Sequence, residues 1–507
     1  MKKRIYIIIC MAIVSALAAC NKKLDLNPND QLATTTFYKQ KSDFDEALAA
    51  VYGSMQTEEF SYGMGFRDCL SDNGYNQFNS GSVTSIDQGN LSPTIGGYQQ
   101  AIYNDAYTSI ARVNSFLAQL SAYTGADITD AIRKQYTGEV MFVRAFMYYQ
   151  LYTIYGDVPL VTTPLTLATE KQPKVPAAQI LAQIESDLNY GITNLSNQPY
   201  ISNYGHACVS SAQALLARVL IFAAYQGTGT VDPTIMGQVR DLCKSVLTQY
   251  SLDPNYISPF RDATQMTSKE VIFTVNFLAP NNTAPWDLYY GDWDACAPYE
   301  NLVDDYECTD GLPWGTSPLT DKVNNMNNRD PRLGMTVYKG FVDFGNGEVH
   351  HPSNPVPTGY GTKKFLEPKN IPYGFSTLSQ QDAVIIRAAE VMLMYAEAEN
   401  ELSGPDATVY QLTTAIRARV SMPAYPAGLT QDEMRQRIRH ERRIELAFEG
   451  LRQFDLVRWH IAGQVLNGLN TGLITFNWQD KFYKWPLPQT EIDKSSGVLV
   501  QNPDYSK

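Results

Sequence analysis

The sequence predicts a mostly α-helical protein in which helical hairpins stack on one another and a loop-rich segment interrupts the stack. Two observations support this prediction. Apolar residues recur every three or four positions over long stretches in both halves of the chain, which is the spacing of one buried helix face. Between residues 251 and 380 this spacing disappears and Gly, Pro, Asn and Asp become frequent, as in loops and turns.

Three helices are predicted in the first two hundred residues, each with one apolar stripe. The stripes comprise Ile102, Ala106, Ile110, Val113, Leu117 and Leu120, then Val143, Met147, Leu151 and Ile154, then Ile180, Ile184, Leu188, Ile192 and Leu195. Gly156 and Pro159 follow the second stripe, and glycine just after a helix with proline beyond it is a common helix end. Further helices are predicted at 211–224, 234–248, 383–402 and 409–420.

Short loops join these helices in pairs. Segments 212–217 and 389–396 alternate small and large residues in the manner of tetratricopeptide helices. Each helical pair needs a neighbour that buries its second face, so tetratricopeptide-like stacked hairpins are the expected architecture. The Val271–Val275 run in the loop-rich insertion has the composition of a short strand.

One more helix is predicted over residues 441–459, which read ERRIELAFEGLRQFDLVRW. Its apolar stripe includes Ile444, Phe448 and Phe454. Gly450 lies inside this helix although glycine costs about 1 kcal/mol there relative to alanine. We therefore expect another backbone to approach Gly450 too closely for a Cβ atom.

The N-terminus predicts a lipoprotein signal. A basic start at residues 2–4 precedes an apolar run, 5–19, that is too short and wrongly flanked for a stable membrane span. The run ends at Leu17-Ala18-Ala19-Cys20, which resembles a bacterial lipobox, in which the cysteine is acylated and becomes the mature N-terminus. The alternative is an ordinary secretory signal. We expect lipidation of Cys20, because a cysteine stands at that place and several acyl chains anchor a protein stably.

Charge and cysteine content exclude several classes of protein. The net charge is −12, and removal of the signal's three basic residues gives −12 − 3 = −15. An acidic chain without a basic run is not suited to nucleic acids or anionic membrane surfaces. Five cysteines remain besides Cys10 and Cys20, and no Cys-x-x-Cys pair predicts a zinc or redox site. A disulfide between Cys296 and Cys308 is compatible with an oxidising compartment, but nothing in the sequence selects that pair.

Residues 441–459 also closely resemble the ERRIELAFEGhRyfDLkRW segment of the SusD/RagB family, the nutrient-binding outer-membrane lipoproteins of the Bacteroidetes. Segments 144–160, 328–333, 485–492 and 501–505 match the family in the same order, with Asp504 in place of the usual glycine. This resemblance implies a tetratricopeptide-built scaffold with an inserted ligand region. It also implies a partner, a SusC-like TonB-dependent outer-membrane barrel that such a protein covers as a lid. The matching motifs identify no ligand-contacting residue.

These observations divide the chain into five parts. We expect a signal peptide at 1–19, a lipidated tether at 20–30, and an N-terminal helical part at 31–250 that contains a binding loop at 57–97. An irregular, ligand-binding insertion follows at 251–380. The C-terminal helical part and its tail, 381–507, are expected to pack on the scaffold.

Composition points to a ligand site in the insertion. Residues 270–321 contain no Lys or Arg but many aromatic and Asp residues. Sugar rings have apolar C–H faces and a rim of hydroxyls, so they bind beside flat aromatic rings and carboxylate or amide acceptors. Each ring contact contributes on the order of 1 kcal/mol. The predicted ligand residues are Trp286, Trp293, Tyr289, Tyr290 and Trp314.

Trp286 and Trp293 are expected to be displayed platforms, and the alternative is that some of these rings pack the insertion onto the helices. In the loop 57–97 the candidates are Asp72 and Tyr75, close in sequence to the amide of Gln77 and to Phe78. The alternative there is an Asx-rich turn.

No motif predicts catalysis, a metal site or a cofactor. Glu441, Glu445 and Glu449 are spaced along one helix ridge like a glycosidase carboxylate pair, but the arginines beside them favour a structural ion network. Asp292-x-Asp294 lacks the further ligands of a calcium loop. We expect a non-enzymatic, lipid-anchored protein that captures an oligosaccharide and passes it to the barrel. The alternatives are a tetratricopeptide-type surface lipoprotein that binds peptides or proteins, and a glycosidase.

Overall fold

The computed structural model describes residues 37–225 and 227–506. The predicted signal peptide, the lipidation site Cys20 and the tether therefore lie outside the described residues. Within those residues, none of the helices combines the length and the apolar character that crossing a membrane requires.

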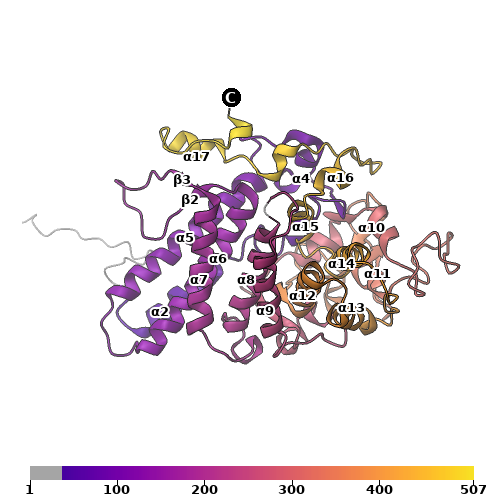
Figure 1. Ribbon diagram of the computed structural model, residues 1–507, viewed down its shortest axis with the longest axis horizontal. Helices are drawn as coiled ribbons and strands as arrows, with labels where there is room; N and C mark the ends of the chain where they lie inside the picture. Colours follow the sequence, from indigo (N-terminus) through magenta and orange to yellow (C-terminus); the bar gives the residue numbers. More distant parts are fainter. Residues whose placement is uncertain (1–36, 226, 507) are drawn as a thin grey trace, which may run out of the picture.

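The helices of the first half lie side by side (Figure 1). They are α2 (Lys41–Gly53), α5 (Tyr98–Ala122), α6 (Asp130–Tyr155), α7 (Ala177–Asn194), α8 (Val209–Ala224) and α9 (Pro233–Val246). From α5 onward each helix packs against the next. The three predicted stripes face the core, and α6 ends at Gly156, whose φ is 74°. These helices confirm the predicted stack of hairpins.

The stack continues after the insertion. Helix α12 (Ala388–Ser403) packs against α9 from the first half and against α13 (Ala407–Arg419) and α14 (Gln431–Glu445) from the second. The chain therefore leaves the stack after α9, forms the irregular segment, and returns to the place where it left. This arrangement confirms a helical scaffold with a loop-rich insertion.

A two-stranded ribbon marks the two ends of the insertion. Strand β4 (Val271–Val275) runs antiparallel to β10 (Ala383–Arg387), with Ala383 opposite Val275 and Arg387 opposite Val271. The helix predicted over 383–402 is thus wrong at its start, because residues 383–387 form a strand and the helix begins at Ala388.

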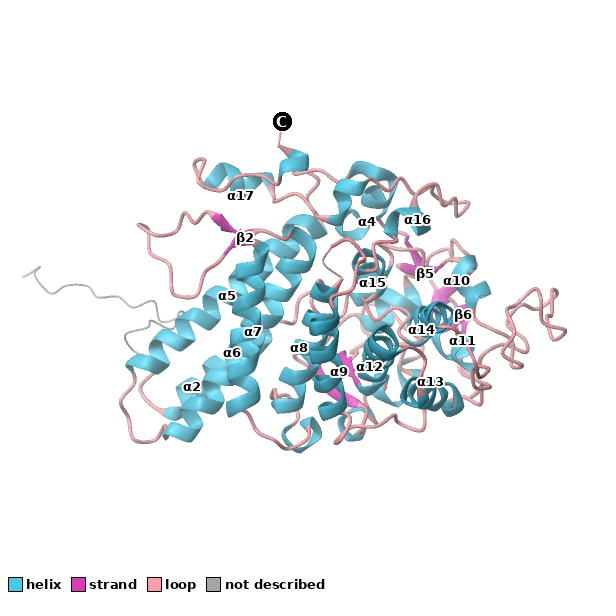
Figure 2. Cartoon of the chain, viewed as in Figure 1, coloured by secondary structure: helices cyan, strands magenta, loops and turns pink. Residues whose placement is uncertain are grey.

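Between these strands the chain is mostly loop, with short elements only (Figure 2). They are β5 (Cys296–Pro298), α10 (Glu300–Asp305), α11 (Pro331–Thr336), β6 (Val337–Lys339), β7 (Val342–Asp343), β8 (Val349–His350) and β9 (Tyr360–Thr362). Strand β6 pairs with β9, and β7 pairs with β8.

The first irregular stretch joins the second. It contains α3 (Met64–Asp68), β1 (Gly74–Asn76) and α4 (Val83–Ser85). Strand β1 runs antiparallel to β5, with Gly74 opposite Pro298 and Asn76 opposite Cys296. The two segments that we expected to bind ligand are therefore connected by backbone hydrogen bonds, although more than two hundred residues separate them.

The single helix predicted over 441–459 is wrong. Helix α14 ends at Glu445 and α15 (Arg452–Arg458) begins after a break, in which Phe448 and Gly450 have φ values of 66° and 76°. The Asp68 carboxylate holds the break by accepting the N–H of Phe448 at 2.5 Å and that of Arg452 at 3.2 Å. A Cβ on Gly450 would lie 3.2 Å from Met64 Cβ and 3.3 Å from Met64 O, which confirms the expected close backbone.

The C-terminal tail returns over the first helices. It contains α16 (Ala462–Leu466) and α17 (Gln489–Lys494), and α17 lies near the ribbon of β2 (Val158–Pro159) and β3 (Lys174–Val175) in Figure 1. Lys174 Nζ donates to Gln501 O at 3.3 Å and to Asn502 Oδ1 at 3.0 Å. The tail is thus fastened to the N-terminal part.

Candidate functional site

Four aromatic rings meet where the two irregular segments join, and we call Phe78, Tyr289, Trp293 and Phe375 the aromatic site. Trp293 is its centre. Tyr289 stacks on Trp293 with ring centroids 5.4 Å apart and an interplanar angle of 19°. Phe78 and Phe375 contact Trp293 edge-on, at 6.0 Å and 5.4 Å between centroids. The rings come from three loops that are far apart in the sequence.

Two of these rings face solvent, and the other two also pack against the core. Phe375 is 84% exposed and Phe78 is 47% exposed, while Tyr289 and Trp293 are half-buried. Large apolar side chains gathered on a surface mark a place where the protein binds something. The aromatic site is therefore a candidate ligand surface.

A single π-helical turn, Asp287–Asp292, positions the two central rings. Tyr289 lies within the turn, and Trp293 follows it, with the Trp293 N–H donating to Leu288 O at 2.8 Å. Isolated π-turns frequently occur at functional sites. The buried Asp287 carboxylate anchors the turn, because it accepts hydrogen bonds from the Glu367 N–H at 2.8 Å and from Ser379 Oγ at 2.8 Å.

Polar groups lie at the edge of the aromatic site. Gln77 Nε2 donates to Trp293 O at 3.1 Å, which places an amide side chain next to the indole. Burial, and then the charge of Glu58, raise the pKa of Tyr289. Burial, and then the charge of Glu59, raise the pKa of Glu58 to about 7. The site thus combines ring faces with an amide group.

Two predicted ligand residues of the insertion are buried, so the prediction that Trp286 is a displayed platform is wrong. Trp286 is 1% exposed and Tyr290 is fully buried. The indole N–H of Trp286 donates to Gln381 O at 2.8 Å, and its ring packs on Phe365. The Tyr290 hydroxyl donates to Tyr62 O at 2.7 Å. The π-turn directs these two side chains into the core and leaves Tyr289 and Trp293 at the surface.

Asp72 is also unavailable to a ligand. It is 3% exposed and forms ion pairs with Arg443 at 3.0 Å and with Arg452 at 2.9 Å. Burial opposes its charge, but the two arginines outweigh burial and lower the pKa of Asp72 to about 2. Its role is structural, because it connects the first irregular segment to α14 and α15.

Tyr75 and Trp314 lie apart from the aromatic site. Tyr75 is half-buried against Tyr299, 6.4 Å between ring centroids, in a small apolar cluster with Leu456 and Phe476. Trp314 is half-buried beneath the guanidinium of Arg329, 5.3 Å from the ring centroid. Of the seven predicted ligand residues, the structure therefore brings Tyr289 and Trp293 together.

The sequence reasoning missed Phe375. This residue stands between Gly374 and Ser376 in a loop without apolar periodicity, but Tyr373 in the same loop is 5% exposed, so the sequence alone gives no signal that Phe375 is displayed. Its position next to Trp293 depends on the fold, because eighty-two residues separate the two in the chain.

The glutamate ridge of α14 forms an ion network. Glu445 contacts Arg332 at 2.9 Å, Arg387 at 2.7 Å and Arg419 at 2.5 Å. Glu441 and Glu449 bind Arg332 and Arg387, respectively, each at 2.6 Å. All three carboxylates are buried, and the surrounding cations lower the pKa of Glu445 against the effect of burial. A glycosidase needs an accessible acid whose pKa is raised, so the structural interpretation is confirmed.

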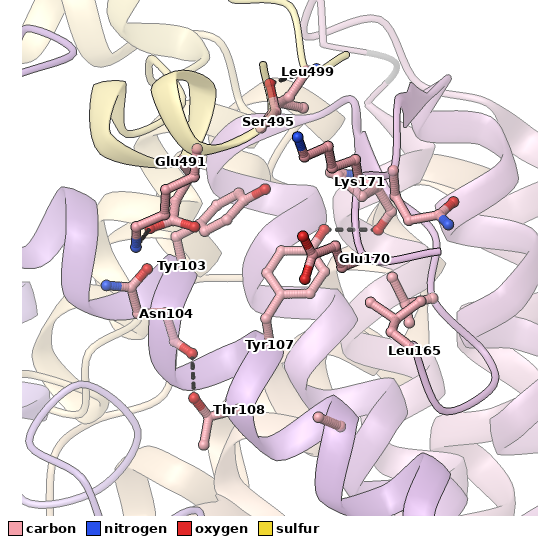
Figure 3. Close-up of a pocket in the computed structure, with 15 residues that line it drawn as sticks. Tyr103, Asn104, Tyr107, Thr108, Leu165, Glu170, Lys171, Glu491, Ser495 and Leu499 are labelled. Atoms are coloured by element: carbon pink, nitrogen blue, oxygen red, sulfur yellow. Dashed lines mark hydrogen bonds and ion pairs between the residues drawn. The ribbon is translucent and has the colours of Figure 1, made fainter. Parts of the chain in front are cut away.

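A separate cavity of about 750 Å³ lies between α5, the loop after β2 and the region of α17 (Figure 3). The Tyr107 hydroxyl at its wall donates to Pro159 O at 2.7 Å, and Lys171 Nζ donates to Ser496 Oγ at 2.8 Å. None of the predicted ligand residues lines this cavity. Across residues 37–225 and 227–506, no group of three or more His, Cys, Asp and Glu side chains is placed to hold a metal ion.

Two family models match the chain. The first is described as the SusD family and matches residues 261–505, and the second is described as starch-binding associating with outer membrane and matches residues 22–221. SusD-like protein P2 of Formosa agariphila is 25% identical over 538 residues, which cover 100% of both chains.

Solved structures share the fold. A SusD-like carbohydrate-binding protein from Bacteroides fragilis superposes with a TM-score of 0.80 at 24% identity, over 92% of this chain and 99% of that one. A laminarin-binding SusD-like protein superposes with a TM-score of 0.67 at 25% identity, over 92% of this chain and 100% of that one.

Proposed function

This chain belongs to the SusD family, a family of carbohydrate-binding proteins, and on that premise we propose that it binds oligosaccharides at the aromatic site. We further propose that a lipid on Cys20 holds it at the outer membrane, where it passes its ligand to a SusC-like TonB-dependent barrel. The observation that carries the proposal is the exposed ring surface of Trp293, Phe78 and Phe375 at the junction of the two irregular segments.

The chemistry of this surface suits a sugar chain. Successive sugar units present apolar C–H faces to the rings, and their hydroxyls reach the Gln77 amide. Three ring contacts contribute about 3–4.5 kcal/mol in total, which alone corresponds to a Kd of roughly 1 mM. Hydrogen bonds at the rim account for any tighter binding.

The buried glutamates support binding without hydrolysis. Glu441, Glu445 and Glu449 are held by arginines inside the protein, so they are not available as a catalytic acid and base. The two carboxyl groups next to Trp293 in the chain, those of Asp292 and Asp294, are buried, whereas glycosidases use a pair that flanks the bond. We therefore propose a capture protein rather than an enzyme.

Calorimetry with a Trp293→Ala variant tests the site. The ligand panel contains laminarin oligosaccharides, because one solved relative is described as laminarin-binding, together with other glucans and a set of peptides. Trp293→Ala should weaken binding of the preferred glycan about tenfold, since one ring contact contributes 1–1.5 kcal/mol. Trp314→Ala is the matched control and should leave affinity unchanged. Equal effects of the two substitutions would contradict the proposal, and a ligand found only among the peptides would favour the peptide-binding alternative.

Purification from the native host tests the partner and the anchor. A C-terminal tag on the full chain should co-purify a barrel-sized membrane protein in mild detergent. Cys20→Ser should release the protein from the outer-membrane fraction. Recovery of this chain alone at native expression would contradict the partner, and a soluble wild-type protein would contradict the anchor.

A further inference from the structure

Two cysteines from the two irregular segments meet in the buried core. Cys69 follows α3 and Cys296 begins β5, and their Sγ atoms are 3.1 Å apart although 227 positions separate them in the chain. Both residues are fully buried. A disulfide bond is about 2.05 Å long, so the two sulfur atoms need to approach by only about 1 Å.

The surroundings accommodate such a bond. Cys296 Sγ also lies 3.1 Å from Gly65 O, but this carbonyl accepts the Cys69 N–H at 3.1 Å and stays hydrogen-bonded when the thiol hydrogen is lost. Cys208 contacts the hydroxyl of Ser211 rather than a second sulfur. The geometry thus selects Cys69, and not Cys308, as the partner of Cys296.

We propose that Cys69 and Cys296 form a structural disulfide that ties the first irregular segment to the second. The oxidising compartment that this requires rests on the proposed outer-membrane location. The bond forms by exchange with the disulfide of a thiol–disulfide oxidoreductase. The two cysteine sulfurs become bonded to each other, and the oxidoreductase disulfide accepts two electrons and two protons and leaves as two thiols.

The bond forms during folding rather than afterwards. Burial raises the pKa of the Cys69 thiol well above its usual value, and a buried thiol is a poor nucleophile for exchange. Oxidation must therefore precede the closure of β1 on β5. Once formed, the bond fixes α3 against β5, which lies three residues after Trp293, and so limits movement between Trp293 and Phe78.

Thiol counting on the mature lipoprotein, extracted from outer membranes in detergent, tests the bond. After denaturation without reductant, we expect three reactive thiols, from Cys208, Cys243 and Cys308. After reduction we expect five. A non-reducing digest should contain one cross-linked peptide pair that joins Cys69 to Cys296. Five thiols before reduction, or a cross-link between other cysteines, would overturn the proposal.

Variants separate the bond from ordinary packing. Cys69→Ala with Cys296→Ala should give three thiols with and without reductant and should lower Tm by on the order of 5 °C, because the bond closes a long loop. Unfolding and refolding in reductant should lower the Tm of wild type but not that of the double variant. Cys243→Ala, a buried control, should keep the cross-linked peptide. A wild-type Tm that is independent of reductant would overturn the inference.

Glycan binding distinguishes failure of this inference from failure of the proposed function. A protein that is isolated with five free thiols and still binds the glycan through Trp293 would refute only the disulfide. A cross-linked protein that binds no glycan would refute only the proposed function.

Discussion

Replacing Glu445 by glutamine should strongly destabilise the protein without changing its binding site. The Glu445 carboxylate accepts from Arg332, Arg387 and Arg419 at 2.9, 2.7 and 2.5 Å, and it is fully buried. Glutamine keeps the volume but removes the charge and turns an N–H₂ group toward guanidinium donors. Breaking a buried ion pair costs about 3–5 kcal/mol. We expect the free energy of unfolding to fall by an amount in that range. The loss does not exceed it, because all three arginines keep other carboxylate partners.

Urea unfolding followed by tryptophan fluorescence measures this loss. Asp432→Asn is the matched control, because Asp432 lies on the same helix with its side chain 84% exposed, and exposed pairs contribute less than about 1 kcal/mol. The midpoint should fall for Glu445→Gln and change little for Asp432→Asn. Folded Glu445→Gln should bind the glycan as wild type does. Equal midpoints for the two variants, or lost affinity at unchanged stability, would refute the structural role of the network.

Three further outcomes follow from the structure. Phe375→Ala should weaken glycan binding roughly fivefold to tenfold at an unchanged Tm, because the ring is 84% exposed and contributes about 1 kcal/mol of contact. Calorimetry measures the affinity and a thermal melt measures Tm. A large fall in Tm would show that the ring is part of the core. Burial opposes the charge of Glu397, but Arg458 and other cations outweigh burial and lower the pKa of Glu397 to about 2. The stability that this carboxylate contributes is therefore complete above its usual pKa and is lost as the pH falls through about 2. Tm measured from pH 7 to pH 2.5 should decrease, and a constant Tm would argue against the buried network. Gly450→Ala should destabilise the protein by about 1–3 kcal/mol, because its φ is 76° and a Cβ would lie 3.2 Å from Met64; an unchanged urea midpoint would contradict this close approach.

Local patterns were sufficient to predict the helical scaffold. The stripes of α5, α6 and α7 are long and regular, and each one is buried as expected. The errors occurred where a distant partner decides the local structure. Residues 383–387 are apolar enough for a helix, but hydrogen bonds to β4, more than one hundred residues earlier, make them a strand. The break after α14 depends on Asp68, nearly four hundred residues away.

The candidate site shows the same limit. Trp286 and Trp293 stand in one stretch of similar composition, so the sequence cannot distinguish the buried ring from the displayed one. The difference is set by the π-turn and by contacts of Trp286 with Gln381 and Phe365. Both irregular segments were predicted to bind ligand, but their meeting through β1 and β5 and the contact of Phe375 with Trp293 require the folded chain.

The position of a bound oligosaccharide decides whether the aromatic site is the binding site. A crystal structure of the protein with the glycan that binds best in the panel should show a sugar ring face within about 4 Å of the Trp293 indole, with Phe78 or Phe375 beside the next unit. A glycan bound instead in the cavity between α5 and α17, with the aromatic site empty, would contradict the account.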